Sequence, residues 1–358
     1  MTPHEPSGAL ALEPGNDSVP APRSLRLARE ATMLAAVATG VNDREPLSSL
    51  ALATLPVPEA GPGRVRIKVA ASSVNMHDLW TLRGVGAPPS GFPRVLGCDV
   101  VGWDPAGNEV LVTSAFGDVD AGGGDETFDP RRTLISEELP GAFAAYTVVP
   151  ARNVIPKPSW LTFDEAACLG VAWGTTYRAL FTRARALPGE SVLVQGAGGG
   201  VSTAAIAMAR AAGLHVVVTS RSAAKRRRAL ELGAHEAHPT GTRLANPVDL
   251  VVDTVGAATW AHSLRSLRPG GRIVTSGATT GGDCPSDLAR VFYKQLSIIG
   301  STAATRAETV RMLQFLRAAG VRPVIDSVHP LDRIHDAFAR AQAPDLFGKV
   351  VVRVASAP

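Results

Sequence analysis

Residues 192–221 read VLVQGAGGGVSTAAIAMARAAGLHVVVTSR, a β-strand, a glycine turn, a helix and a second strand in succession. The apolar run 192–194 meets glycines at 196 and 198–200, an Ala-rich helical segment follows, and 216–218 is again apolar. This is the βαβ unit that places a pyrophosphate on the N-terminus of a helix. Glycines allow a tight turn and a close approach to the phosphates, while free N–H groups and the helix dipole attract them. The alternative is a glycine-rich turn without a ligand, but the flanking strand and helix favour a dinucleotide site.

The end of the second strand indicates which dinucleotide binds. It reads Ser220-Arg221, where NAD-specific proteins usually carry Asp or Glu for the ribose hydroxyls. A hydroxyl followed by a guanidinium suits a 2′-phosphate, and Lys225 adds positive charge, so we predict NADPH as the cofactor. Because 226–228 are also arginines, a solvated helix face is the alternative interpretation of Arg221. The predicted cofactor-binding residues of this unit are Gly198, Gly199, Gly200, Val201, Ser220, Arg221 and Lys225.

Length and composition indicate a globular protein of two domains. The chain has 358 residues, of which 45% are hydrophobic and 19% charged. Its net charge of +4 is too modest for a nucleic-acid footprint, and no Lys/Arg stripe alternates with aromatic residues. The three cysteines, Cys98, Cys168 and Cys284, are odd in number and widely spaced, which fits a reducing compartment rather than a disulfide framework. No apolar run has membrane-spanning length and the N-terminus lacks the features of a signal peptide, so we expect a cytoplasmic protein. We also expect a small-molecule substrate, and no nucleic-acid or membrane partner.

The pattern along the chain changes near residue 160. Before it, short apolar runs separated by Gly and Pro predict an irregular β domain, interrupted by an acidic, Gly-rich surface excursion at 118–140. After it, helices alternate with five buried strands, and a sixth near 234–237 would complete a doubly wound sheet. The Pro269–Gly271 turn is expected to end a helix and lead into a strand. The other predicted helices are 164–186 with a break near Gly174, 223–232, 257–267 and 306–319, and the later strands are 248–252, 272–276, 296–300 and 324–328.

Several segments together resemble the medium-chain dehydrogenase/reductase superfamily across residues 31–354. They are GRVRIKVAASSVNMHDLWTLRG, GAFAAYTVVPARNVIPKP, AACLGVAWGTTYRAL, the βαβ unit, LRPGGRIVTSGATTG and FGKVVVRV. The resemblance implies an α/β protein with a GroES-like β-rich catalytic domain and a Rossmann doubly wound parallel sheet. It also implies a substrate site between the domains and a homodimer formed through the Rossmann sheets. The expected division is a flexible tail 1–28, the catalytic domain 29–158, the NADP-binding domain 159–302 and a return to the catalytic domain at 303–358.

The positions that hold catalytic zinc in many members of this superfamily carry other residues here. They are Asn75, Cys98 with Asp99 in the Gly-His-Glu-like segment, and Val171, and residues 117–141 lack the cysteines of a structural-zinc lobe. Valine cannot coordinate a metal, so the usual zinc site is not expected. A variant site of His77, Cys98 and Asp99 is chemically conceivable, and a small buried cysteine is the other interpretation of Cys98.

The missing zinc favours one kind of reaction. Reduction of a simple carbonyl profits from a Lewis acid, whereas hydride addition to a conjugated C=C bond forms an enolate that hydrogen-bond donors can stabilise. Zinc-free members resembling quinone oxidoreductases and enoyl reductases carry V-N-x-x-D, which stands here as Val74-Asn75-Met76-His77-Asp78. The resemblance implies that Asn75 orients the substrate carbonyl and that Asp78 orders the site; a loop-capping Asn and a helix-capping Asp are the alternatives.

Other positions complete the predicted site. His77 has the titration range of a proton donor, and a structural histidine is the alternative. By resemblance Thr175 packs against the nicotinamide, with Val255 and Gly277 lining the same side. Tyr177 is a candidate donor, although a core tyrosine fits it as well. We therefore predict an NADPH-dependent, zinc-independent oxidoreductase acting on an enone, enoyl compound or quinone; metal-free carbonyl/alcohol chemistry and a non-redox NADPH-binding protein are the alternatives.

Overall fold

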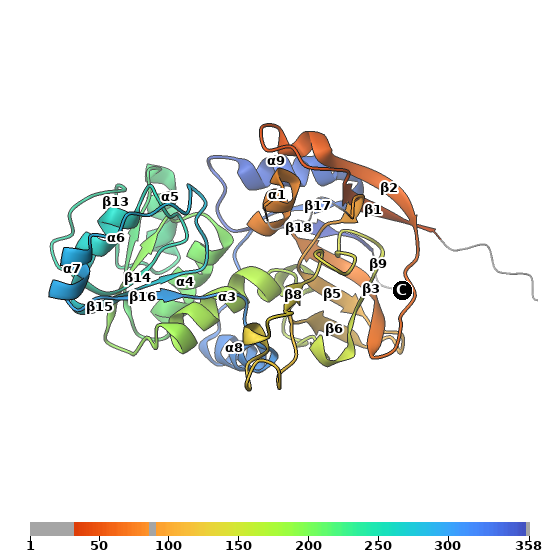
Figure 1. The fold of residues 1–358 in the computed structure, drawn as a ribbon, viewed down its shortest axis with the longest axis horizontal. Helices are drawn as coiled ribbons and strands as arrows, with labels where there is room; N and C mark the ends of the chain where they lie inside the picture. The colour runs from red at the N-terminus through yellow and green to blue at the C-terminus, as the bar shows by residue number, and fades with distance from the viewer. Residues whose placement is uncertain (1–31, 86–90, 356–358) are drawn as a thin grey trace, which may run out of the picture. The chain divides into compact units, whose positions relative to one another are not determined.

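A parallel sheet of six strands carries the glycine turn in the computed structural model, which describes residues 32–85 and 91–355 (Figure 1). The predicted tail, residues 1–28, lies outside the described residues. The strand order is β13-β12-β11-β14-β15-β16, so the order reverses between β11 and β14, directly beside the turn. This is where doubly wound sheets bind ligands. The strands are β11 (Ser191–Gln195), β12 (His215–Thr219), β13 (Glu236–His238), β14 (Val248–Val252), β15 (Leu267–Thr275) and β16 (Ser297–Gly300). The predicted fold class is confirmed, including the short sixth strand.

Helices cover both faces of this sheet, as its continuous apolar strands require. Val192 and Val194 of β11 join the core that contains helix α4, whereas Leu193 joins the opposite core with Trp260 and Leu264 of helix α6. The helices of this domain are α4 (Gly200–Ala211), α5 (Ala223–Glu231), α6 (Trp260–Ser266) and α7 (Leu288–Tyr293). None of the helices in the described ranges combines the length and apolar character needed to cross a membrane.

Two local predictions in this domain were wrong. The Pro269–Gly271 turn does not lie between a helix and a strand, because β15 begins at Leu267 and continues through it. The pairing of β14 with β15 shifts register between Val248 and Leu250, and this bulge accommodates the turn inside the strand. Helix α7 was not predicted: none of its six residues is buried, so no apolar periodicity marks it.

The β-rich domain contains an open sheet to which the C-terminal segment returns. Strand β18 (Lys349–Arg353) pairs antiparallel with β3 (Arg64–Ser73) and parallel with β17 (Ile325–Pro330). The other strands are β1 (Thr32–Ala38), β2 (Leu50–Pro56), β4 (Arg94–Val95), β5 (Val100–Trp103), β6 (Glu109–Val112), β7 (Ala115–Phe116), β8 (Thr133–Leu134), β9 (Tyr146–Pro150) and β10 (Val154–Pro156). The helical elements are α1 (Met76–Arg83), α9 (Ile334–Gln342), η1 (Pro46–Ser49), η2 (Glu126–Phe128), η3 (Ala151–Asn153) and η6 (Leu331–Arg333). Helices α1 and α9 share one apolar core with β18, so the C-terminal segment helps to hold α1 in place.

The helical segment at 163–183 links the two domains. It consists of α2 (Phe163–Ala166), the wide π-turns η4 (Leu169–Trp173) and η5 (Arg178–Arg183), and α3 (Gly174–Tyr177) between them. The helical backbone does not break at Gly174, where the break was predicted. A glycine is needed there because a Cβ would lie 3.2 Å from the Cβ of Ala304. Helix α8 (Arg306–Ala319) packs against α3 and begins at a capping box of Thr305 and Glu308.

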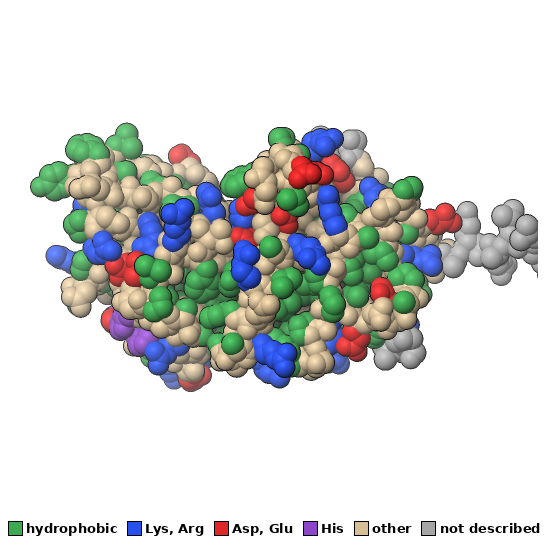
Figure 2. Space-filling model, turned by 90° about the horizontal axis from the view of Figure 1, so that it is seen from below, with side chains coloured by type: hydrophobic (Ala, Val, Ile, Leu, Met, Phe, Trp, Pro, Cys, Tyr) green, Lys and Arg blue, Asp and Glu red, His purple; other side chains and the backbone are tan. Residues whose placement is uncertain are grey.

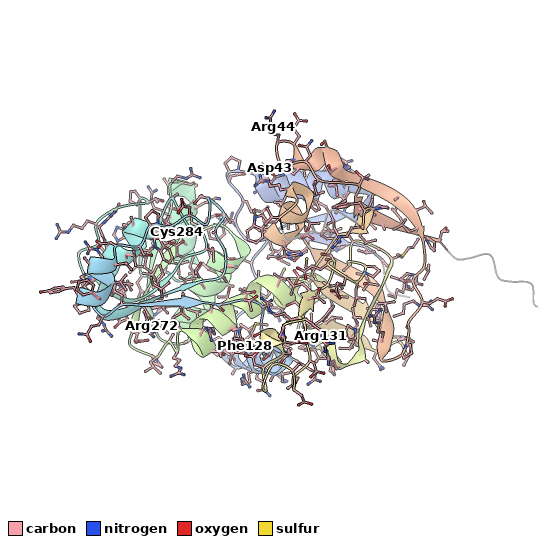
Figure 3. The ribbon with its side chains drawn as sticks, in the orientation of Figure 1. Asp43, Arg44, Phe128, Arg131, Arg272 and Cys284 are labelled. Carbon is pink, nitrogen blue, oxygen red and sulfur yellow. The ribbon has the colours of Figure 1, made fainter. Side chains whose placement is uncertain are left out.

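A lobe of residues 118–132, within the predicted surface excursion, is fastened to these helices. Arg178 is 2% exposed, and its guanidinium donates to Asp125 Oδ2 at 2.7 Å and to Glu308 Oε2 at 2.8 Å. Figure 3 labels two other residues of the lobe, Phe128 and Arg131, near the helices; the Arg178 guanidinium carbon lies 5.7 Å from the centroid of the Phe128 ring. Ion pairs therefore attach the lobe, which contains no cysteine.

Candidate functional site

Two of the three consecutive glycines 198–200 are required by the packing of the protein itself. A Cβ on Gly198 would lie 2.3 Å from the Leu346 carbonyl oxygen, and one on Gly200 would lie 2.6 Å from Lys349 Cδ. Gly199, the N-cap of α4, has open space where its Cβ would stand. Because the first N–H groups of a helix have no intrahelical acceptor, the open surface at Gly199 has the shape and polarity of an anion site.

The end of β12 gathers positive charge next to this turn. Lys225 Nζ lies 2.7 Å from the Cβ position of Gly198, and burial lowers the pKa of this lysine. Arg226 donates to the backbone carbonyl of Ser220 at 2.7 Å, so one of the following arginines holds the loop rather than a ligand. Arg221 is exposed, and neither it nor Lys225 forms an ion pair with any residue in the described ranges. Both cations therefore remain available to a phosphate.

Asp253, at the carboxyl end of β14, has a structural role. Its Oδ1 accepts from the N–H groups of Val255 at 2.9 Å and Gly256 at 3.1 Å, and Ser263 Oγ donates to Oδ2 at 2.6 Å. The carboxylate therefore shapes the loop that places Val255 at the edge of the sheet.

Gly277, on the next loop, lies opposite a tryptophan of the β-rich domain. Its Cβ position is 3.6 Å from Thr254 Cβ and 3.8 Å from Cη2 of Trp80 on α1. Thr175 is buried in α3. The structure thus brings α1 to the Gly277 loop, where the nicotinamide is expected.

Asn75 and Asp78 fix the beginning of α1. Asp78 is fully buried; its Oδ2 accepts from the Asn75 N–H at 2.8 Å and its Oδ1 from the Gly97 N–H at 2.9 Å. Burial raises the pKa of Asp78, and the backbone hydrogen bond from Asn75 opposes that effect. Asp78 therefore connects α1 to the loop that carries Cys98 and Asp99.

A second buried carboxylate, Asp99, joins Asn75, Asp78 and Lys349 in one network of side chains, here called the substrate wall. Asp99 Oδ2 accepts from the Asn75 amide at 2.8 Å and from the Ser73 hydroxyl, and Oδ1 accepts from the Val171 N–H at 2.7 Å. Lys349 Nζ, 3.6 Å from Asp99 Oδ2, donates to Asn75 Oδ1 at 2.6 Å. The second N–H of the Asn75 amide donates to the Ser73 carbonyl at 3.1 Å. Asn75 therefore has its hydrogen-bonding groups engaged within the protein, which favours a role in building the site over direct binding of the substrate carbonyl.

The same arrangement does not fit a zinc ion. The three positions that hold ligands in zinc-dependent relatives do converge, but Asn75 and Val171 meet there only as partners of Asp99. Cys98 Sγ lies 3.3 Å from Ser136 Oγ, and burial together with the neighbouring carboxylates raises the pKa of the thiol far above its ordinary value. A metal needs the thiolate. Within 32–85 and 91–355, no group of three His, Cys, Asp or Glu side chains is placed to bind a metal.

Among the predicted site residues that the structure describes, His77 alone has a buried side-chain nitrogen or oxygen without a hydrogen-bond partner. Its Nε2 is buried, has no hydrogen-bond partner among the described residues, and lies 3.7 Å from Glu137 Oε1. The other carboxylate oxygen of Glu137 is held by Thr133 Oγ1 at 2.8 Å and by the Leu134 N–H at 2.7 Å.

Tyr177 belongs to an aromatic cluster. Its ring centroid lies 5.0 Å from that of Phe181 and 6.4 Å from that of Phe315 on α8. This packing favours the core interpretation of Tyr177 over that of a donor.

Three residues of the site were missed in the sequence. Lys349 is 274 residues from Asn75 in the chain, and only the β18–β3 pairing brings the two together. Trp80 follows His77 by three positions, so the helical period could have placed both on one face. Glu137 lies in a segment predicted only as a surface excursion, and no motif in the surrounding sequence pointed to it.

A cavity of about 460 Å³, lined in part by Trp103, Phe163 and Arg353, opens elsewhere in the β-rich domain, and its lining contains none of the predicted site residues.

Comparison with known proteins agrees with this geometry. Residues 61–159 match the family model of the alcohol dehydrogenase GroES-like domain, and residues 200–318 match that of zinc-binding dehydrogenases. A quinone oxidoreductase of Mus musculus is 31% identical over 298 residues, which are 78% of this chain and 85% of the mouse protein. The chain belongs to the medium-chain dehydrogenase/reductase superfamily. It is an oxidoreductase with a nicotinamide cofactor, although its residues do not fit the zinc in the name of the second family model.

Solved structures of the superfamily differ in cofactor and reaction. An NAD-dependent alcohol dehydrogenase is 34% identical with a TM-score of 0.83, covering 90% of this chain and 100% of its own. The 2-octenoyl-CoA carboxylase reductase CinF, solved with NADP and 2-octenoyl-CoA, is 28% identical with a TM-score of 0.83, covering 91% and 88%. Fold similarity alone therefore does not choose between the two cofactors or between a carbonyl and a C=C bond as the reducible group.

Proposed function

We propose that this enzyme reduces an activated C=C bond (in an enone or enoyl compound) or a quinone by hydride transfer from NADPH, without zinc. The observation that carries the proposal is the network of Asn75, Asp99, Val171 and Lys349 at the positions where relatives hold the metal. A simple carbonyl gains most from a Lewis acid, whereas a conjugated system spreads the developing charge over an enolate. A site built from hydrogen bonds suits the second reaction.

The chain has groups suited to hold NADPH. The N–H groups of Gly200 and Val201 in the first turn of α4 would bind the pyrophosphate beside the open Gly199 position, and Arg221 with Lys225 would bind the 2′-phosphate. Thr175, Val255 and Gly277 are the proposed walls around the nicotinamide. Bound NADPH supplies the hydride.

On the substrate side, Asn75 and Asp78 are proposed to hold the wall and His77 to supply a proton. Asp78 keeps the N-terminus of α1 fixed, and Asn75 connects Asp99 with Lys349. The stem of Lys349 also lies against Gly200, so one buried lysine contacts both the phosphate turn and the substrate wall. A displacement of the turn would therefore also disturb Asn75.

Steady-state assays test the proposal. The purified enzyme is given NADPH or NADH with an enone, a quinone, and the saturated ketone of the same skeleton. We expect turnover of the enone or quinone, little turnover of the ketone, and a preference for NADPH that Arg221→Asp reverses. Preference for NADH in the unmodified enzyme would exclude the role given to Arg221.

Metal-free carbonyl/alcohol chemistry is a second candidate, favoured by the similarity to the NAD-dependent alcohol dehydrogenase. In that case the saturated ketone or its alcohol would be the better substrate in the same assay. Binding of NADPH without turnover of any of these compounds would instead indicate a non-redox protein.

We further propose that the enzyme is a homodimer formed through the outer edge of the Rossmann sheet. β16 pairs only with β15 among the described strands, and its Ile298 is 44% exposed. On the adjacent helix α7, Leu288, Phe292 and Tyr293 are 71–84% exposed. Hydrophobic side chains protrude at the end of the space-filling view where Figure 1 places α7 (Figure 2). An open strand edge beside exposed apolar side chains suits a second copy of the chain.

A further inference from the structure

We propose that Glu137 is a positioning residue that holds His77 as the proton donor of the reaction. The inference rests on the proposed function, since it concerns the proton that completes reduction of the C=C bond.

The first observation is the state of the His77 side chain. Its Nε2 is buried without a hydrogen-bond partner, although most buried polar atoms in proteins have one. Glu137 Oε1, at 3.7 Å, lies beyond hydrogen-bonding distance from it. A movement of less than about 1 Å would bring the two atoms to the ordinary N–H···O distance. His77 Nε2 thus lies beside a carboxylate without a hydrogen bond to it. A group that must release a proton to a substrate needs such an uncommitted position.

The second observation is that Glu137 is held from its other side. Oε2 accepts from Thr133 Oγ1 and the Leu134 N–H, which leaves Oε1 directed to His77. The buried Arg94 donates to the backbone carbonyls of Ser136 and Glu137, so the segment itself is anchored. A carboxylate fixed in this way can orient an imidazole, because its position does not depend on the imidazole.

The third observation is the face of α1 on which His77 lies. Met76, His77, Trp80 and Arg83 are the only residues of this helix that are not buried, and helical spacing places them on one side. Trp80 reaches the Gly277 loop at 3.8 Å. His77, one turn before Trp80, therefore lies on the side of α1 that faces the expected nicotinamide site.

These positions assign a balanced proton transfer. After hydride addition to the β-carbon, the former C=C electron pair is delocalised between the α-carbon and the carbonyl oxygen. The imidazolium of His77 gives its Nε2 proton to the α-carbon, forming the C–H bond and leaving a neutral imidazole. The imidazole regains a proton from solvent by way of Glu137, whose side chain is 30% exposed. The Glu137 carboxylate lies 3.7 Å from the ring nitrogen that gives up and regains this proton.

The contact is tested first without cofactor or substrate. Glu137→Gln keeps the shape of the side chain and an oxygen for Thr133 and Leu134, while Glu138→Gln alters an exposed neighbour outside the site. In ¹⁵N NMR spectra of the apo enzyme, with the His77 signals assigned from His77→Gln, we expect E137Q to move the Nε2 signal and E138Q to leave it in place. Identical His77 signals in the wild type and E137Q would overturn the proposal.

Kinetics then test the role. With an enone substrate, we expect E137Q to lower kcat about 10-fold to 100-fold, with KM changed less than about 3-fold and an increased solvent deuterium isotope effect. The double variant H77Q/E137Q should be no slower than H77Q, because Glu137 acts through His77. Multiplicative losses, or an E137Q enzyme with the kcat and isotope effect of E138Q, would refute the role. If the wild-type enzyme reduces neither enone nor quinone, the proposed function fails instead, and the NMR comparison still decides the contact.

Discussion

The buried arginine that fastens the lobe to the linking helix allows a quantitative prediction. Arg178→Met removes a guanidinium that is 2% exposed and leaves Glu308, itself 3% exposed, without its 2.8 Å partner. Breaking a buried ion pair by removing one partner costs about 3–5 kcal/mol, because an uncompensated charge stays behind. Asp125 is less buried and regains water, so most of the lost stability comes from the Glu308 carboxylate, which stays buried without a partner.

Urea unfolding of matched variants measures the effect. Arg333→Met removes a pair with Asp336 that is shorter still, at 2.6 Å, but Arg333 is 68% exposed, and exposed pairs contribute about 0–1 kcal/mol. We expect R178M to lose about 3–5 kcal/mol of unfolding free energy and R333M less than about 1 kcal/mol. The double variant R178M/E308Q should recover part of the loss, since it no longer buries the carboxylate. An R178M enzyme no less stable than R333M would refute the reasoning.

Further predictions concern the turn, acid stability and association. Gly199→Ala should leave the melting temperature within about 2 °C, because the Cβ position is open, yet weaken NADPH binding at least about 10-fold as measured by calorimetry. Burial raises the pKa of Asp249, but hydrogen bonds from Ser191 outweigh it and lower the pKa to about 2. The resulting stabilisation, about 2 kcal/mol, is complete above the ordinary value of 3.8 and is lost as the pH falls through about 2, so Asp249→Asn should flatten the acid unfolding curve in that range. Phe292→Glu with Tyr293→Glu should halve the mass seen by light scattering if α7 lies in a dimer interface.

The central strands around the glycine turn, β11, β12 and β14, were predictable because their apolar side chains are buried on both faces of the sheet. Continuous apolar runs such as Val216–Val218 have few other interpretations when helices separate them. Helix α7 and the bulge at Pro269–Gly271 escaped prediction for opposite reasons. The helix buries none of its residues, and the turn residues that normally end a strand are accommodated here inside one.

The candidate site was predictable only where it is local in sequence. Asn75, His77 and Asp78 lie within four residues and were identified together, whereas Lys349 reaches them through strand pairing across most of the chain. The role of Gly198 was also incompletely predicted. In the sequence, a glycine here indicates space for a phosphate. In the structure, the Leu346 carbonyl oxygen already excludes a side chain at this position. A glycine required by packing within the chain and a glycine that makes space for a ligand cannot be told apart in the sequence.

The central claim is hydride transfer to a conjugated bond without a metal. Its most direct test is NADPH oxidation by the chelator-treated enzyme, with metal content measured in the same sample, on an enone and on its saturated ketone. We expect turnover of the enone at full rate with no stoichiometric zinc, and little turnover of the ketone. Activity that disappears with the metal and returns on addition of zinc would contradict it.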